Sequence, residues 1–476
     1  MKKNQKNAMS LRPPIVVVLG HVDHGKTTLL DSIRKTSVAV KEAGGITQSI
    51  GASQVKTLDG KTITFIDTPG HAAFSSMRAR GAKIADIAIL VVAADDGMKP
   101  QTKEALEYIL AEDMPFIIAA TKIDLQTASS ETVITQLEKE GVSFEGRGGN
   151  VPLVKVSGKT GQGVDELLEI INLLAELHEI KGDPEGPMDA LVIETARGKS
   201  GLSVSLVVKN GTLKVGDEVI TENAYGKVKG LFDYLGKSVD KVEPGEPSQI
   251  LGFTESPEVG SKVWVKNQKE ALPAILTHRQ LQQVTDNDKI MILIKAKNAG
   301  ALEAVIAHIP PEFYCISSGV GEITETDIFL AKSANANIYA FESKASSGIL
   351  KLAKTEGVKV ETFTIIYKLF EKLQEEIVKR QIVILGRAQI LNFFPFNNKK
   401  VAGCKVIDGK ITKDDKVTLT RNEKPLGTAR MSSMKKGRQD VAQVIQGEEF
   451  GVILAPQLEF KVGDMLLSVR EKKIDL

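Results

Sequence analysis

Apolar runs alternate with helical patterns over the first 180 residues. Five runs rich in β-branched and aliphatic residues are predicted to form strands, at 15–19, 62–66, 87–92, 115–120 and 151–156. Helical patterns follow the first, third and fifth runs, the last of them at 164–177. Strands that alternate with helices predict a doubly wound, mostly parallel α/β sheet, with ligand loops at the carboxyl ends of the strands.

The rest of the chain changes pattern at a Gly- and Pro-rich cluster, 181–187, which predicts a domain boundary. Short strands with regular turns follow and predict a β-barrel. The chain then repeats itself in three places in the same order: 208–219 resembles 406–417, 242–246 resembles 444–448, and 259–263 resembles 462–466. The repeat predicts two barrels of one type. Between them, 285–364 has a mixed helix and strand pattern, and 365–380 is predicted to be an exposed connecting helix.

Composition places the chain among ordinary globular, multidomain proteins. Its 476 residues, 42% hydrophobic and 26% charged, are too many for one core. The two cysteines, Cys315 and Cys404, provide neither a disulfide framework nor metal-ligand spacing. No run reaches the roughly 20 apolar residues of a membrane span, so no membrane partner is expected and the predicted location is cytoplasmic.

Charge is unevenly distributed along the chain. The net charge is +2, but residues 380–476 hold 18 Lys and Arg against 11 Asp and Glu. A domain that faces a polyanion shows such a surplus, although a solvated lysine-rich face gives the same count.

Residues 20–27 read Gly-His-Val-Asp-His-Gly-Lys-Thr and lie between a predicted strand and a predicted helix. This arrangement is the phosphate-binding loop, whose glycines permit a turn that points backbone amides at phosphate oxygens. Lys26 is expected to reach the β- and γ-phosphates and Thr27 to hold Mg²⁺. Asp67, at the end of the second strand, is expected to hold Mg²⁺ through water. The predicted phosphate-binding residues are Asp23, His24, Gly25, Lys26, Thr27, Thr28 and Gly70.

Two polar segments at strand ends predict recognition of guanine. The carboxylate of Asp124 can accept from guanine N1–H and its exocyclic amine, which adenine does not offer in that arrangement. The stem of Lys122 can lie along the base, and the segment 157–159 would bring an amide to guanine O6. The predicted guanine-binding residues are Thr121, Lys122, Asp124, Ser157, Gly158 and Lys159. GTP and GDP are therefore the predicted ligands.

The glycine-rich segment 41–51 is predicted to be a mobile loop. Thr47 is the candidate that completes Mg²⁺ coordination when a γ-phosphate is present, which would make the loop an order–disorder switch. A flexible linker is the alternative.

These motifs resemble those of translational GTPases and, within that group, the bacterial translation initiation factor 2 family. Residues 20–27 and 67–71 carry the general resemblance, and 42–48, 69–74, 77–81 and 91–97 carry the closer one. The resemblance implies that His71 orients the attacking water and that Val22 and Ile46 gate its approach. It also implies a monovalent cation beside Asp23. From the residues alone, an exposed turn histidine is the alternative for His71.

The last barrel resembles the family domain that holds the aminoacyl end of formylmethionyl initiator tRNA. The resemblance implies a tRNA-binding set of Cys404, Lys435, Lys436, Arg438, Glu449, Phe450 and Gly451. An apolar pocket beside cations suits a formylated, uncharged amine on a single-stranded end. Three positions depart from the family, which has Asn at Thr121, Cys at Phe450 and Arg at Lys436. These departures predict lower nucleotide affinity and altered selection of formyl-methionine, and Cys404 is expected to pack as a small apolar residue.

The resemblance recurs in every domain and gives the predicted organisation. The chain is expected to comprise a short basic tail (1–11), a P-loop GTPase domain (12–180), a β-barrel (187–267), an α/β sandwich domain (285–364), a connecting helix (365–380) and a tRNA-binding β-barrel (381–476). The long amino-terminal extension of many family members has no counterpart here, and the connector 266–288 is short. Both features predict a reduced version of the factor.

The predicted function is a ribosome-stimulated GTPase that brings initiator tRNA to the small ribosomal subunit and promotes joining of the large one. The other initiation factors are its expected partners, and a monomer is its expected form off the ribosome. One alternative is a GTP-dependent binding switch that barely hydrolyses. Another is a different tRNA-carrying translational GTPase, against which the Gly-Gly-Ile-Thr-Gln segment at 44–48 argues.

Overall fold

The computed structural model describes residues 9–36, 47, 50–198, 201–266, 289–396, 399–421 and 424–471. Ile46, the rest of the segment 41–49 except Thr47, and the connector 267–288 lie outside the described residues. Contacts divide the chain into two compact units, Met1–Phe370 and Glu371–Leu476.

The amino-terminal α/β domain is built on one sheet with the strand order β3-β4-β2-β5-β6-β7, in which all pairs are parallel except β3–β4. Its strands are β2 (Ile15–Gly20), β3 (Gly51–Lys56), β4 (Thr62–Asp67), β5 (Ile87–Ala93), β6 (Phe116–Thr121) and β7 (Leu153–Lys155). Its helices are α1 (Lys26–Arg34), the 3-10 helix η2 (Ala72–Phe74), α2 (Ser75–Ile84), α3 (Pro100–Ala111), α4 (Ser130–Lys139) and α5 (Val164–Leu177).

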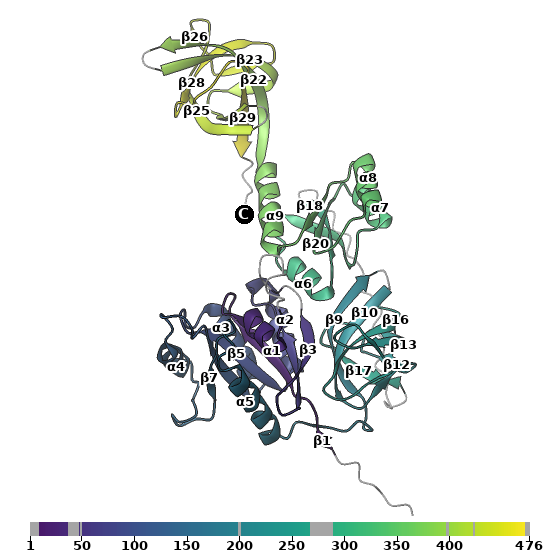
Figure 1. The fold of residues 1–476 in the computed structure, drawn as a ribbon. Helices are drawn as coiled ribbons and strands as arrows, with labels where there is room; N and C mark the ends of the chain where they lie inside the picture. Colours follow the sequence, from purple (N-terminus) through teal and green to yellow (C-terminus); the bar gives the residue numbers. More distant parts are fainter. Residues whose placement is uncertain are drawn as a thin grey trace, which may run out of the picture. The chain divides into compact units, whose positions relative to one another are not determined.

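Helices cover both faces of this sheet, which explains why its strands are near-continuous apolar runs (Figure 1). Side chains of alternate strand residues, such as Val16, Val18 and Ile89, form one core with apolar residues of α1 and α5. On the opposite face α2 packs close to β2, where Gly81 lies against Val17. The predicted doubly wound, mostly parallel sheet is confirmed, and the loops at the carboxyl ends of β2, β4, β6 and β7 share one edge.

The first barrel contains the strands β9 (Asp189–Gly198), β10 (Gly201–Asn210), β12 (Glu218–Ile220), β13 (Tyr225–Phe232), β16 (Pro247–Phe253) and β17 (Lys262–Val265). Pairing runs β9-β10-β16-β13-β12-β17 and returns to β9, so the described strands close a ring. Short strands β11 (Leu213–Lys214), β14 (Ser238–Val239) and β15 (Lys241–Val242) lie outside this ring.

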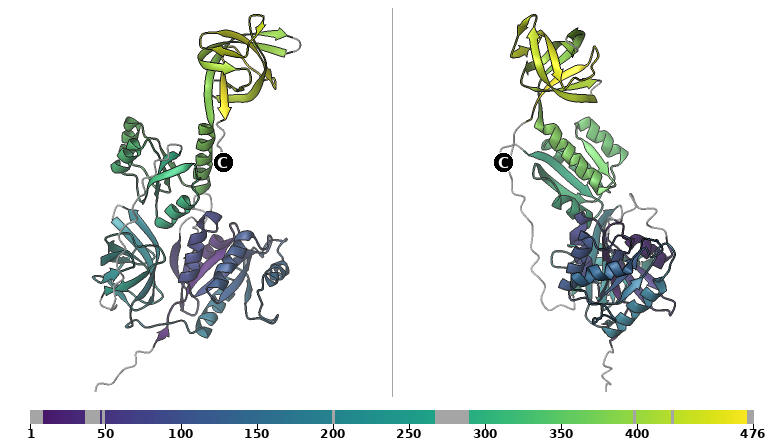
Figure 2. Two further views of the ribbon diagram at one scale, coloured as in Figure 1. Left: turned by 180° about the vertical axis from the view of Figure 1, so that it is seen from behind. Right: turned by 90° about the vertical axis from the view of Figure 1, so that its left-hand side faces the viewer.

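The carboxy-terminal barrel is seen from two sides in Figure 2. It contains β22 (Ile382–Phe396), β23 (Lys399–Thr412), β24 (Lys416–Arg421), β25 (Lys424–Lys436), β28 (Glu449–Ala455) and β29 (Met465–Glu471), with short strands β26 (Gln439–Asp440) and β27 (Gln443–Ile445). The described strands close a ring in the order β22-β23-β28-β25-β24-β29. This order matches the first barrel strand for strand, as the internal repeat predicted.

The repeated segments also make the same hydrogen bonds in the two barrels. The amide of Lys214 donates to Asp217 Oδ2 at 2.8 Å, and the amide of Thr412 donates to Asp415 Oδ2 at 2.8 Å. The Gly245 amide donates to the carbonyl of residue 208 at 2.7 Å, and that of Gly447 to the carbonyl of residue 406 at 2.9 Å. Turn residues therefore carry the repeat because each fixes an equivalent turn.

Between the barrels, a parallel sheet has the order β19-β18-β20-β21. Its elements are β18 (Ile290–Ala296), α6 (Ala299–Ala307), β19 (Phe313–Val320), α7 (Glu325–Ser333), β20 (Asn337–Phe341), α8 (Ser347–Glu356) and β21 (Val360–Phe363). Helix α9 (Ile366–Gln381) follows, and β22 begins at the next residue.

Three features differ from the sequence-based expectations. Ser10–Leu11, placed in the basic tail, forms strand β1 and pairs with β8 (Lys181–Gly182). Strands β3 and β21 were not predicted, because their sequences are polar and short. The connecting helix is not exposed on all sides: its apolar positions Leu369, Leu373 and Ile377 are buried. Among the described residues, no helix has the length and apolar character of a membrane span.

Candidate functional site

The phosphate loop joins β2 to α1 and depends on backbone conformations that few residues adopt. Gly20 has φ of 144°, and a Cβ there would lie 2.4 Å from the Val91 carbonyl oxygen. Asp23, at φ 62°, occupies the left-handed region although it is not glycine. Such conformations persist where the surrounding structure fixes them and are concentrated at binding sites.

Lys26 is buried at the centre of the loop. Its Nζ donates to the carbonyl oxygens of Gly20 at 2.9 Å and His21 at 2.5 Å. Burial lowers the pKa of Lys26 to about 8, and the charge of Asp67 opposes that shift. Gly70 approaches from the end of β4 so closely that a Cβ there would lie 2.3 Å from Lys26 Nζ. The cation is therefore fixed between two backbone segments, where it can face a phosphate chain.

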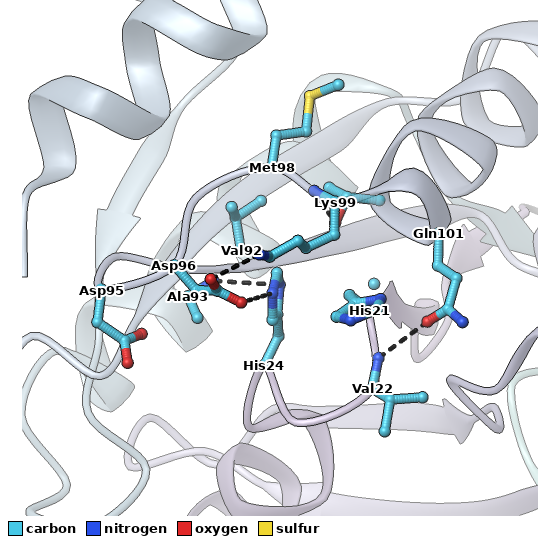
Figure 3. A network of polar contacts seen from close by, with 12 residues as sticks. His21, Val22, His24, Val92, Ala93, Asp95, Asp96, Met98, Lys99 and Gln101 are labelled. Carbon is cyan, nitrogen blue, oxygen red and sulfur yellow. Dashed lines mark hydrogen bonds and ion pairs between the residues drawn. The ribbon is translucent and has the colours of Figure 1, made fainter.

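A polar network braces the loop from outside (Figure 3). His24 Nδ1 accepts from the Ala93 amide at 3.3 Å, and its ring lies 4.9 Å from that of His21. Its Nε2 lies 3.7 Å from Asp96, which pairs with Lys99 at 2.7 Å. Burial lowers the pKa of His24 to about 4, so its ring is neutral at pH 7. The predicted phosphate contact of His24 can come only from its backbone, because its side chain points into this brace.

Gln101 completes the brace from helix α3. Its Oε1 accepts from the Val22 amide at 3.1 Å. None of Asp96, Lys99 and Gln101 was predicted as a site residue, since the segment before α3 has no phosphate-loop signature. Asp96 lies in the segment 91–97 that carries the family resemblance, and for Lys99 and Gln101 the signal was only that polar residues follow a strand end.

The guanine end of the site is held by side-chain hydroxyls. Thr121 Oγ1 donates to the His24 carbonyl oxygen at 2.6 Å, which ties the end of β6 to the phosphate loop. Ser157 Oγ donates to Asp124 Oδ1 at 2.7 Å, and this bond lowers the pKa of the Asp124 carboxyl. Lys122 has φ of 58°, and its Nζ lies 3.6 Å from Asp95. A fixed, ionised carboxylate can pair with two N–H donors on a base.

At the opposite end, Thr27 Oγ1 and Thr47 Oγ1 lie 2.9 Å apart. Asp67 is buried at the end of β4, close enough to influence the charge of Lys26. Hydroxyl and carboxylate oxygens are the ligands that Mg²⁺ prefers, usually together with water and phosphate oxygens. The donor set predicted for Mg²⁺ therefore fits that ion.

His71 lines the same cavity as Thr27 and Thr47, and it immediately precedes the short helix η2. Its Nδ1 accepts from the Ala73 amide at 2.8 Å, so the imidazole caps η2. Burial lowers the pKa of His71 to about 4, helped by the charge of Arg78. The ring is thus neutral at pH 7, and with Nδ1 accepting, its proton lies on Nε2.

Arg78 fixes the backbone on either side of Gly70. This fully buried guanidinium donates to the carbonyl oxygens of Pro69 and His71 and to Glu104 Oε2, the last at 2.7 Å. The position of His71 therefore depends on a residue of the segment 77–81 that was not predicted to belong to the site.

One cavity of about 350 Å³ joins the two ends of the site. It is lined by Val22, Asp23, Gly25, Lys26, Thr27, Thr28, Thr47, Gly70, His71, Thr121, Lys122, Asp124, Leu125, Ser157, Gly158 and Lys159. The predicted residues His24 and Asp67 do not line it, and Ile46 lies outside the described residues.

A second cavity, of about 870 Å³, opens in the carboxy-terminal barrel. It is lined by Leu391, Asn392, Phe394, Val401, Gly403, Cys404, Ser433, Lys435, Gly437, Arg438, Glu449, Phe450, Gly451 and Ile453. Of the predicted residues only Lys436 is not among them, because its Nζ turns to Glu448 Oε1 at 2.6 Å. Burial raises the pKa of Cys404 to about 12, so its thiol packs rather than reacts.

Comparison with known proteins agrees with this architecture. Residues 12–176 match the model of the elongation factor Tu GTP binding domain, 187–266 that of elongation factor G domain 2, and 265–374 that of translation-initiation factor 2. Together with the phosphate loop and the guanine end, they define the class as a translational GTPase, which binds GTP and GDP.

The chain belongs to the translation initiation factor IF-2 family. It is 40% identical to the factor of Caldanaerobacter subterraneus over 96% of this chain and 69% of that protein. Identity to the Thermus thermophilus factor is 38% over 98% of this chain and 88% of that protein. A 40% identical factor from Persephonella marina is matched over 96% of this chain but only 55% of its own length, so the chain spans about half of that relative. A solved structure of GDP-bound aIF5B from Aeropyrum pernix is 27% identical, with a TM-score of 0.47 and coverage of 96% of this chain and 92% of that one.

Proposed function

We propose that the chain is a GTP-hydrolysing initiation factor that delivers formylmethionyl initiator tRNA to the small ribosomal subunit and promotes joining of the large subunit. One observation carries the proposal: a single cavity has the Thr27–Thr47 pair at one end and the Asp124–Ser157 pair at the other. A guanosine triphosphate with its metal ion needs both ends, since one must hold a charged phosphate chain and the other a base edge.

At the phosphate end, Lys26 faces the β- and γ-phosphates, with backbone amides of the loop from Asp23 to Thr28 around them. Thr27 and Thr47 would hold Mg²⁺ with their hydroxyl oxygens, and Asp67 would hold it through water. When bound, the ion neutralises charge on the phosphate oxygens. The buried setting of Lys26 supports this role, because electrostatic attraction is strengthened where water is excluded. A monovalent cation beside Asp23 would add to the same effect.

His71 orients the attacking water. A neutral ring carries one N–H that can donate to a water oxygen, and it cannot act as a strong base. Val22 lines the cavity beside His71, as a residue that limits access of water would. Ile46, which lies outside the described residues, is proposed as the second residue that limits access of water.

At the base end, Asp124 accepts from the two guanine N–H groups. The Ser157 hydroxyl fixes the carboxylate and leaves its other oxygen for the base. An adenine would leave this carboxylate without donors, which is a large penalty in a binding site.

The carboxy-terminal cavity takes the acylated end of the tRNA. Cys404 and Phe450 supply buried apolar surface, and Lys435 and Arg438 supply positive charge. An amine that is formylated has lost its charge and can enter apolar surroundings that reject an ammonium group. The lysine and arginine side chains suit the phosphates of the single-stranded end, so binding should weaken as salt is raised.

The remaining parts of the proposal concern the location of the factor, its partners and its oligomeric state. The factor works in the cytoplasm with both ribosomal subunits and the other initiation factors, and it is a monomer off the ribosome. The printed names of the relatives support the initiation step, since all those compared are called translation initiation factor IF-2.

A second candidate function, a GTP-dependent binding switch with little hydrolysis, is favoured by one contact. His71 Nδ1 is engaged by its own helix, so the ring is folded back rather than extended. In this case His71→Ala would leave GTP turnover unchanged, whereas the main proposal predicts a large loss.

Competition against a fluorescent GTP analogue tests the nucleotide part on the full chain. GTP and GDP should displace the analogue, ATP should not, and Asp124→Ala should abolish the preference while the exposed Glu112→Ala keeps it. Equal displacement by ATP would remove the guanine assignment. Filter binding with formylated and unformylated initiator tRNA tests the second cavity, and equal retention of both would remove only the tRNA-selection part.

A further inference from the structure

The imidazole of His71 is held on several sides. Its Nδ1 accepts from the Ala73 amide at 2.8 Å, and the Phe74 ring lies 5.9 Å away in an edge-on arrangement. The ring of Tyr367 lies closer, with a centroid distance of 4.1 Å and an interplanar angle of 68°. Only 7% of His71 is exposed. Two aromatic rings and one hydrogen bond therefore define its side-chain orientation.

Tyr367 does not belong to the nucleotide-binding domain. It lies in the first turn of α9, almost 300 residues after His71 in the sequence. Its pKa is raised by burial of the phenol and by the charge of Asp23 in the phosphate loop. About half of its surface, 48%, is nevertheless exposed, which means that the contact can open without unpacking a core.

The first turn of α9 is itself anchored. Ile366 and Leu369 are fully buried, and the Phe370 ring lies 5.6 Å from that of His308 at the end of α6. His308 Nδ1 lies 2.9 Å from the Ala304 carbonyl oxygen, which fixes the ring that Phe370 meets. The backbone under Tyr367 is therefore held in place, and its ring restrains His71 rather than following it.

We propose that Tyr367 is a positioning residue that keeps His71 folded back as the cap of η2 and so holds GTP hydrolysis at a low basal rate. The inference rests on the proposed role of His71 in orienting water. To present Nε2 to a water beside the γ-phosphate, the imidazole must leave the Ala73 amide, and the Tyr367 ring fills the space on one side of it. Rotation of the exposed Tyr367 ring away from His71 would release the histidine.

Tyr367 brings helix α9, which lies outside the nucleotide-binding domain, into contact with His71. Tyr367 does not line the cavity, and we expect its removal to leave nucleotide affinity unchanged. A restraint on His71 from outside the cavity changes the rate of hydrolysis without changing affinity. That separation of rate from affinity distinguishes this role from a merely structural one.

The test is single-turnover GTP hydrolysis by the full chain without ribosomes. Tyr367→Ala should raise the rate by about fivefold, which corresponds to about 1 kcal/mol, while the Kd for a GTP analogue stays within about twofold. Tyr367→Phe keeps the ring and should retain the original rate. Tyr225, a similarly exposed tyrosine in β13, provides the matched control, and Tyr225→Ala should change neither quantity.

Two further variants complete the test. His71→Ala combined with Tyr367→Ala should remove the gain, since the gain acts through His71. Tyr367→Ser gives a second removal of the ring and should reproduce the increase. An unchanged or lower rate in both ring-removal variants, with the Kd preserved, would overturn the inference and leave the proposed function standing. Failure of the original chain to bind GTP would instead overturn the proposed function.

Discussion

Single hydroxyl groups determine how the nucleotide site is joined together. Thr121 stands where the sequence resemblance implies Asn, and its Oγ1 reaches the His24 carbonyl oxygen at 2.6 Å. The tie between the end of β6 and the phosphate loop is therefore kept by a shorter side chain. The second bonding direction of an amide is lost, because one hydroxyl has one proton.

Removing that hydroxyl should weaken nucleotide binding. Thr121→Val leaves a buried carbonyl without this donor, at a cost of about 1 kcal/mol or more, so the Kd for GTP should rise by about fivefold or more. Thr121→Ser keeps the donor and should bind nearly as well as the original chain. Titration of a fluorescent GTP analogue measures both, and equal Kd values for the two variants would contradict the role of the hydroxyl.

Arg78 is the residue on which the His71 backbone depends. Arg78→Met removes donors from two carbonyl oxygens and from Glu104, so we expect the nucleotide-binding domain to lose about 3 kcal/mol of stability. Denaturant-induced release of a bound GTP analogue provides the measurement. Arg147, whose pair with Glu131 is exposed, is the control, and Arg147→Met should leave the stability nearly unchanged. Similar losses of stability in both variants would contradict the stabilising role of the buried Arg78 contacts.

At the scale of elements, three segments meet around Glu194 of β9. Its Oε1 accepts from the Thr195 amide at 2.9 Å and from the Gly300 amide at 3.2 Å, in the first turn of α6. The positive charge of Arg80, in α2, lowers the pKa of Glu194 slightly, but burial dominates and raises it to about 7. Strand β9 of the first barrel, helix α2 and helix α6 of the α/β domain therefore meet at one carboxyl group.

The raised pKa of Glu194 makes the stability of this junction depend on pH. The folded-state pKa, about 7, lies above the unfolded value of 4.5, so the contribution is fully present below pH 4.5 and is lost as pH rises through 7. The loss reaches about 3 kcal/mol by pH 8. Glu194→Gln does not titrate, so its melting temperature should exceed that of the original chain at pH 8 more than at pH 5.

The exposed Glu222 serves as the control for this comparison, and Glu222→Gln should not alter the pH dependence. Parallel melting curves for Glu194→Gln and the original chain across this pH range would contradict the assignment.

At the scale of the whole molecule, the fold class and many of the residues that line the two cavities could be predicted from the sequence. The reason is local: each motif follows an apolar strand, and parallel strands bring their carboxyl ends to one edge. The repeated turns were sufficient for two barrels with one strand order, because residues such as Asp217 and Asp415 fix equivalent turns. The roles of these residues stay predictions.

Contacts between distant segments could not be predicted in the same way. Gln101 braces the phosphate loop from α3, and Tyr367 reaches His71 from α9, but neither lies in a motif. Their positions depend on how whole elements pack. Lys436 does not line the second cavity for a related reason: its side chain turns to Glu448, a partner that strand pairing brings near.

The most direct test is GTP turnover by the full chain, with ribosomal subunits and formylated initiator tRNA present or absent. We expect slow GTP turnover by the chain alone and an increase of about 100-fold or more with both subunits. This increase corresponds to a fall of about 2.7 kcal/mol or more in the activation barrier once His71 is oriented. His71→Ala should lose that increase while its Kd for GTP is retained. Turnover that is the same with and without ribosomal subunits, or an increase that survives His71→Ala, would contradict the account.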